Sequence, residues 1–141
     1  MIDNMHGFDE NMNKKSVAET ITNENGTAIK FSDGTMICRH TISKEEFMIA
    51  SDLNAAAQGI NIYRSNNPKW NFPVSFIDEN IQVQANVNNS TIGTRLTFVR
   101  LANISRALIE IQLLGLESFT ETGDAYKNLK EVYITATGCW K

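Results

Sequence analysis

Basic residues, cysteine and long apolar runs are scarce in this chain, and each scarcity excludes a class of protein. The 13 basic residues are outnumbered by 16 acidic ones, which argues against a nucleic-acid-binding protein because such proteins need a basic face. Two cysteines cannot form a disulfide framework, and there is no run of about eighteen apolar residues to insert into a membrane. The first residues lack the basic and apolar segments of a signal peptide, so we expect any export to use another route.

What is present fits one globular domain. A chain of 141 residues, of which 42% are apolar, can bury enough surface for a core without metal or disulfide cross-links.

The strongest local signal is a β-hairpin in residues 27–42. Two alternating segments flank the dipeptide Asp33-Gly34, which suits the positive φ angles of a two-residue type I′ loop. Such a loop sets Phe31 opposite Met36 in the ladder, with both side chains toward the core. The side chains predicted to share this face are Ile29, Phe31, Met36 and Cys38.

Further segments also have the patterns of strands. Residues 81–87 alternate strictly between apolar and amide side chains. Residues 107–114 fit a strand or a helix, and we favour the strand because Gly115 ends the run early. Other strands are predicted in residues 60–64, 72–76, 96–101 and 132–140, and a capping box at 43–46 predicts a short helix.

These elements predict an all-β fold, an antiparallel β-sandwich of about six to eight strands. The sandwich should span residues 27–141. Residues 1–26 are polar and Asn-rich, and we expect a short helical or extended lead-in there.

Residues for catalysis or metal binding are few. Cys38 and His40 lie on one face of the predicted hairpin, but they are about 6.5 Å apart along the strand, and a core thiol is usually inert. No zinc or calcium spacing and no Gly-rich phosphate loop are present in the sequence. We therefore predict a protein that is not an enzyme, with no catalytic residues, metal or cofactor.

Aromatic residues in polar loops indicate a sugar site. Tyr63, Trp70, Phe119 and Tyr126 stand among amide, hydroxyl and carboxylate residues, and Arg64 follows Tyr63. An aromatic face covers the C–H face of a pyranose while polar neighbours bind its hydroxyls, so these five are the predicted ligand-binding residues. The alternative is that each ring is a partly buried anchor for its loop.

Three segments follow one another in a distinctive order: residues 29–38 (IKFSDGTMIC), residues 70–76 (WNFPVSF) and residues 132–141 (VYITATGCWK). They resemble, in turn, the IKFPDGTMI-type hairpin, the FPVAF-type strand and the IAIGRW-type closing strand of a C-terminal domain found in tailed-phage fibre and receptor-binding proteins. That family is similar to H-type lectins, which are small antiparallel sandwiches that trimerise and bind carbohydrate. The resemblance spans residues 27–141 and identifies no particular binding residue.

The resemblance implies a tail-fibre tip domain that attaches to a bacterial surface glycan as a homotrimer. The expected partners are two further copies, the glycan, and the rest of the fibre or baseplate, with no nucleic acid and no membrane insertion. Such a protein is made in the host cytoplasm, released by lysis, and located in the virion tail. The alternative is a structural tail or baseplate component that trimerises or caps a fibre without binding a receptor.

Overall fold

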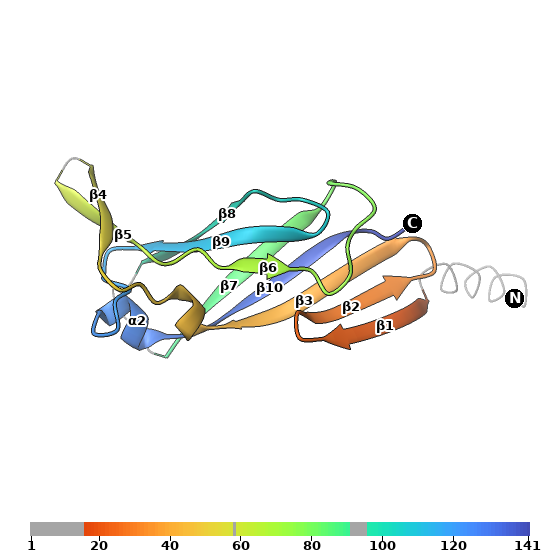
Figure 1. The fold of residues 1–141 in the computed structure, drawn as a ribbon, viewed down its shortest axis with the longest axis horizontal. Coiled ribbons are helices and arrows are strands. Elements are labelled where there is room, and N and C mark those ends of the chain that lie inside the picture. The colour runs from red at the N-terminus through yellow and green to blue at the C-terminus, as the bar shows by residue number, and fades with distance from the viewer. Residues whose placement is uncertain (1–15, 58, 91–95) are drawn as a thin grey trace, which may run out of the picture.

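Two antiparallel sheets pack face to face in the computed structural model, which describes residues 16–57, 59–90 and 96–141 (Figure 1). Sheet A holds, in spatial order, β1 (Val17–Asn23), β2 (Gly26–Phe31), β3 (Thr35–Ser43), β10 (Leu129–Cys139) and β7 (Gln82–Asn89). Sheet B is centred on β9 (Leu108–Gly115). One edge of β9 pairs with β8 (Thr97–Ala102). The other edge pairs with β6 (Lys69–Asn71) and with β5 (Ile60–Arg64). β5 in turn pairs with β4 (Leu53–Ala57).

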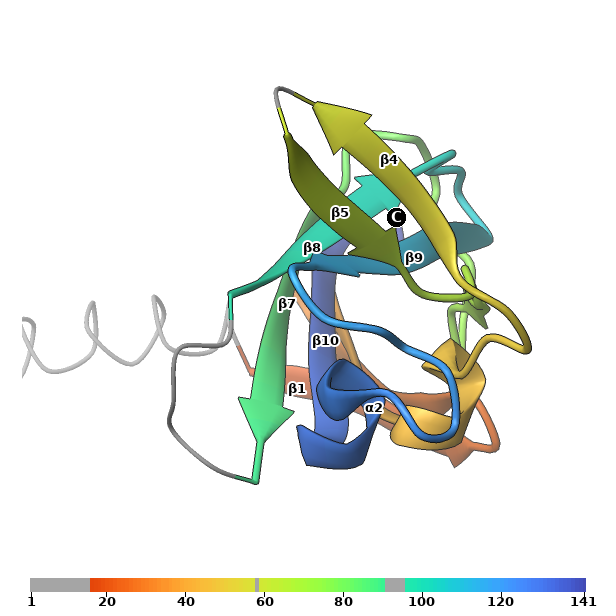
Figure 2. The same ribbon diagram turned by 90° about the vertical axis from the view of Figure 1, so that its left-hand side faces the viewer.

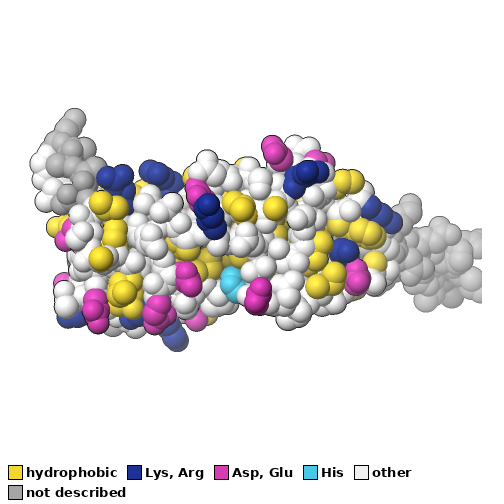
Figure 3. Space-filling model, in the orientation of Figure 1, with side chains coloured by type: hydrophobic (Ala, Val, Ile, Leu, Met, Phe, Trp, Pro, Cys, Tyr) yellow, Lys and Arg dark blue, Asp and Glu magenta, His cyan; other side chains and the backbone are white. Residues whose placement is uncertain are grey.

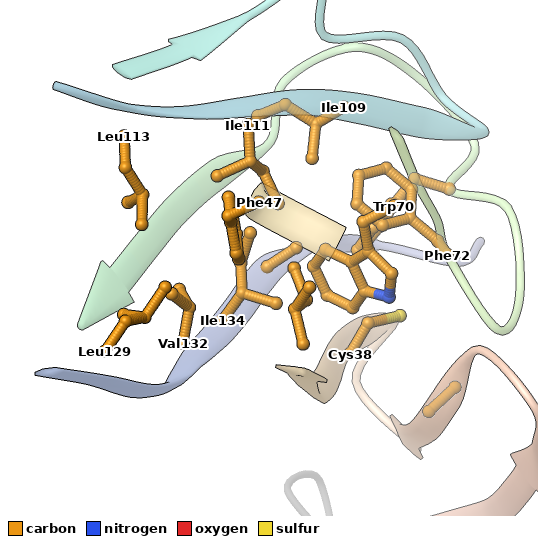
Figure 4. Close-up of a cluster of buried hydrophobic side chains, with 14 of the residues drawn as sticks. Cys38, Phe47, Trp70, Phe72, Ile109, Ile111, Leu113, Leu129, Val132 and Ile134 are labelled. Atoms are coloured by element: carbon orange, nitrogen blue, oxygen red, sulfur yellow. The ribbon is translucent and has the colours of Figure 1, made fainter. Parts of the chain in front are cut away.

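Period-two alternation in the strands builds the core between the sheets. Side chains of β9 point across the sandwich toward those of β10 (Figure 4). Phe47 lies between them and is fully buried. The facing apolar side chains are Ile109, Ile111 and Leu113 from β9 and Leu129, Val132 and Ile134 from β10.

The fold is thus all-β and sandwich-like, as the sequence predicts, with ten strands in the described residues where fewer were expected. The strands predicted in residues 81–87 and 107–114 are confirmed, because they overlap β7 (Gln82–Asn89) and β9 (Leu108–Gly115) in all but one or two residues at the ends. Two short helices, η1 (Lys44–Phe47) and α2 (Asp124–Asn128), connect strands. No helix among the described residues is long and apolar enough to cross a membrane.

The predicted register of the β2–β3 hairpin is wrong by one residue. Lys30, and not Phe31, lies opposite Met36. A type I′ loop needs two positive φ angles, but here only Gly34 has one, at 99°. Its amide donates to the carbonyl oxygen of Phe31 over 3.0 Å, so the loop has three residues and the register moves. The residues facing the core are therefore Ala28, Met36 and Cys38.

Other local predictions also differ from the structure. Residues 72–76 form no strand, because Phe72 and Phe76 instead insert their rings into the core from an irregular segment. The predicted cap is absent, since the Ser43 side chain makes no capping hydrogen bond to η1.

Part of the predicted lead-in belongs to sheet A. Val17–Asn23 is the edge strand β1, whose side chains are mostly exposed, so the apolar alternation that marks a strand is missing there. Residues 24–25 form the turn to β2, of which Gly26 is the first residue, and residues 1–15 lie outside the described residues.

The molecule is elongated, and its two ends differ. The described chain begins and ends at one end of the long axis (Figure 1). The β4–β5 hairpin and α2 lie at the opposite end, called the distal end below, and Figure 2 views the molecule from there. The hairpin extends beyond the sandwich in both views.

Candidate functional site

An open cleft lies on one side of the sandwich, where the pairing of the sheet A strands is incomplete. β2 pairs with β3 only as far as Arg39, whereas β3 continues to Ser43, and β6 of sheet B lies across the gap. The cleft has a volume of about 290 Å³, at the lower end of the range for small-molecule sites. Its lining residues include Glu24, Asn25, His40, Glu46, Trp70 and Asn71.

Two rings form a rigid wall of this cleft. The Trp70 indole is only 3% exposed, and its Nε1 donates to the carbonyl oxygen of Asn25 over 2.8 Å. The His40 imidazole lies almost parallel to it, at 9° and 6.2 Å between ring centroids. The indole also packs edge to face with the Phe72 ring, with centroids 5.0 Å apart. Packing therefore fixes the wall before any ligand arrives.

The mouth of the cleft is acidic and rich in hydrogen-bonding groups. Glu24 and Glu46 are exposed carboxylates, whereas the ammonium of Lys69 lies 3.9 Å from Glu110. Figure 3 shows a histidine side chain near the middle of this face, with acidic side chains on either side. Burial lowers the pKa of His40, so at neutral pH its uncharged ring offers one donor and one acceptor.

Of the five predicted ligand-binding residues, Trp70 alone lines the cleft. Tyr63 and Arg64 are the last residues of β5, Tyr126 lies in α2 and Phe119 in the loop before it, and none of these four lines the cleft. The prediction that the rings are exposed is wrong for Trp70, Phe119 and Tyr126, which are 3%, 1% and 9% exposed. Buried rings contribute large apolar areas to a core, so these three residues anchor their segments instead of presenting a face to solvent.

The other four predicted residues have separate surroundings. Tyr63 is half-buried and pairs with Gly115, whose Cα lies beside the Phe119 ring. The ammonium of Lys44 sits 4.3 Å from the centroid of the Tyr126 ring. Arg64 is on the opposite side of β5 from Tyr63 and points to the outer face of sheet B.

Sequence reasoning missed the side chains that surround Trp70 in the cleft. Glu24, Glu46 and Asn71 come from three separate segments, and no local pattern joins them. The strand pattern brings His40 into the argument only beside Cys38, and the two do face the same side of β3. The Cys38 thiol points to the carbonyl oxygen of Val74 at 3.9 Å, and burial raises its pKa to about 11. Nothing here activates that thiol.

No group of three or more metal-ligating side chains occurs within the part of the chain that the structure describes. Comparisons with protein-family models, with curated proteins and with solved structures find no match to this chain.

Proposed function

We propose that this chain is the receptor-binding domain of a phage tail fibre or a phage-tail-like particle, and that it attaches to a bacterial surface glycan as a homotrimer. The observation that carries the proposal is that the three segments resembling the tail-fibre domain form one packed unit. The glycan, two further copies and the rest of the fibre would be its partners, and the virion tail its location.

The closing strand packs on the hairpin. The Trp140 indole Nε1 donates to the carbonyl oxygen of Phe31 over 2.8 Å, and its backbone amide donates to that of Gly34 over 2.9 Å. A Cβ placed on Gly138 would lie only 2.8 Å from the Phe76 ring, so glycine permits this close approach. The landmark segments are thus a structural unit, and their resemblance supports a shared fold more directly than a shared ligand.

The cleft beside His40 and Trp70 is where a sugar would bind in this proposal. Its carboxylate, amide and hydroxyl groups are suited to a polyhydroxylated ligand. The carboxylates of Glu24 and Glu46 disfavour an acidic sugar, because Lys69, the one cation of the lining, already has an acidic neighbour. A neutral or amine-bearing sugar fits these charges. Several copies on one particle would strengthen weak binding at each site.

The burial of the predicted aromatic residues favours a second candidate function. A sugar-binding ring must expose a face, yet Trp70 and Phe119 are almost fully covered. A structural component that trimerises or caps a fibre needs no such face.

Binding of the labelled chain to polysaccharide extracted from candidate host bacteria separates the two functions. We expect saturable binding by the native chain, lost in the double variant Glu24→Gln, Glu46→Gln. Glu121→Gln, which alters an exposed acid outside the cleft, is the matched control and should bind normally. Absence of binding to every polysaccharide and glycan tested would favour the structural function. Binding that survives the double variant would place the sugar elsewhere.

A further inference from the structure

A polar groove lies on the outer face of sheet B, next to the cleft. Its volume is about 280 Å³, close to that of the cleft. The two are neighbours, because Lys69 of β6 lines the cleft and its ammonium lies 3.9 Å from Glu110 in the groove. We call it the sheet B groove, and its lining residues include Asn67, Arg100, Ala102, Asn103, Glu110 and Gln112.

Two register pairs of β8 and β9 form the floor of the groove. Arg100 pairs with Gln112, and Ala102 pairs with Glu110. Because Ile111 between the two β9 residues is buried in the core, all four of these side chains point outward. Ala102 carries only a methyl group, so the floor is hollow beside the longer side chains.

Hydrogen bonds within the chain hold two amide side chains in the groove. Nε2 of Gln112 donates to the carbonyl oxygen of Ser65 over 3.0 Å, and the amide nitrogen of Asn103 donates to the carboxylate of Glu110. Asn103 directly follows β8 and has a φ of 54°, a left-handed conformation that asparagine tolerates better than most residues. The side-chain oxygens of both amides have no donor among the residues that the structure describes, so they can accept hydrogen bonds from a ligand.

The charges around the groove leave a cation without a partner. The carboxylate of Glu110 is offset by the nearby ammonium of Lys69. Arg100 is exposed and makes no ion pair or hydrogen bond within the described part of the chain. Arg64, one register row along the same face, has a buried Nε that also lacks an acceptor there. Basic side chains over sheet B are visible at the upper left of Figure 3. The groove therefore favours an anion, whereas the cleft disfavours one.

We propose that the sheet B groove binds a carboxylate-bearing sugar, such as a uronic acid residue of a bacterial polysaccharide. The Arg100 guanidinium pairs with the carboxylate through two parallel N–H donors, a geometry that arginine forms and lysine does not. The amide oxygens of Asn103 and Gln112 accept hydrogen bonds from the sugar hydroxyls. That the ligand is a sugar rests on the proposed function, whereas its negative charge follows from the groove itself. The cleft and the groove would then hold differently charged residues of one polysaccharide.

The test is a titration of the ¹⁵N-labelled full chain with sodium glucuronate, followed by NMR. We expect saturable shifts of the Arg100 Nε–H and the Gln112 side-chain amide, and no shift of the Trp70 indole N–H, which reports on the cleft. Glucose, which lacks the carboxylate, and inorganic phosphate, which lacks the sugar, should each bind at least tenfold more weakly than glucuronate.

Two variants and one control locate the binding. Arg100→Gln should weaken glucuronate binding about tenfold or more, because it removes charge-assisted hydrogen bonds. Arg39→Gln removes the same charge from the exposed outer face of sheet A and should bind normally. Ala102→Leu fills the floor without changing any charge, and it should also weaken binding tenfold or more if the hollow holds the sugar.

Glucuronate binding that survives Arg100→Gln, or phosphate binding as tight as that of glucuronate, overturns the inference. The outcomes also separate it from the proposed function. Polysaccharide binding that is lost in the variant Glu24→Gln, Glu46→Gln, without any shift by glucuronate, would overturn the groove alone. Arg100-dependent glucuronate binding by a chain that binds no polysaccharide would overturn the receptor-binding function alone.

Discussion

The outer faces of the two sheets differ sharply, although their inner faces are equally apolar. On sheet A, one register row runs from Thr22 through Thr27, Arg39 and Thr135 to Gln84. The corresponding row at the distal end of sheet B contains two leucines, a phenylalanine and one arginine. The first row is made of groups that bind water, and the second of groups that water solvates poorly.

The difference shows that the outward-facing residues of each strand, more than the inward-facing ones, carry information about function. In both sheets the inward residues are apolar, because each sheet must cover the other. The outward residues are free of that requirement, so they reflect what each sheet meets in solution. The outer face of sheet A presents groups that water solvates well, whereas the distal part of sheet B presents apolar side chains.

The largest expected loss of stability comes from comparing an inward-facing with an outward-facing residue of sheet A. Ile134 is 1% exposed, and Ile134→Ala should lower the free energy of unfolding by about 2–5 kcal/mol. The variant removes apolar atoms that are buried on folding, and it leaves a cavity in their place. Thr135→Ala, one residue along on the outer face, should change it by less than about 0.5 kcal/mol. Urea denaturation at one protein concentration measures both. Equal losses would mean that the outer face of sheet A is not simply solvated.

Thiol labelling makes the same comparison without a change in the core. Cys139 is exposed on the outer side of β10, whereas Cys38 is buried on the inner side of β3. Raising the pKa of Cys38 from 9.0 to about 11 lowers its thiolate fraction by about a hundredfold, before access is considered. One thiol should therefore react promptly with a disulfide reagent in the native protein, and two after unfolding. Cys139→Ser should abolish the prompt reaction; two prompt reactions would show that sheet A opens readily.

The turns of the two edge hairpins should also respond differently. Gly26, the first residue of β2 after the turn from β1, has a φ of 115°, and a Cβ there would overlap the carbonyl oxygen of Arg39. Gly59, beside β5, has a φ of 81° and no atom within 4 Å of such a Cβ. Both alanine variants incur the strain of positive φ, about 1–2 kcal/mol, but Gly26→Ala adds the clash. Urea denaturation should find Gly26→Ala clearly less stable, and equal losses would exclude a contribution from the clash.

The sequence alone predicts these sheets where burial on one side imposes an alternation, as in β7 and β9. It mispredicts the β2–β3 register because the loop type depends on a single dihedral angle at Asp33. Phe72 and Phe76 alternate like strand residues, yet they insert into the core from irregular backbone. The cleft could not be predicted at all, since it joins Glu24, His40 and Trp70 through pairing between distant segments.

The smallest expected effect concerns His40, which lies where sheet A borders the cleft. Burial lowers the pKa of its imidazole below 6.5, so the unfolded chain binds a proton more readily than the folded one. Stability from this group is therefore complete above about pH 6.5 and declines as the pH falls toward the folded pKa. The charged side chains that line the same cleft are Glu24, Glu46 and Lys69.

We predict that the urea midpoint of the native chain decreases as the pH is lowered from about 7 to about 5.5. His40→Asn should remove the contribution of this residue to that decrease. Gln82→Asn, on the outer face of sheet A, should leave the pH dependence unchanged and serves as the control. A steeper dependence in His40→Asn would mean that the nearby carboxylates stabilise the imidazolium more than burial disfavours it. The pH dependence of stability at the cleft would then come from the attraction between the imidazolium and the carboxylates, and not from the burial of the His40 ring.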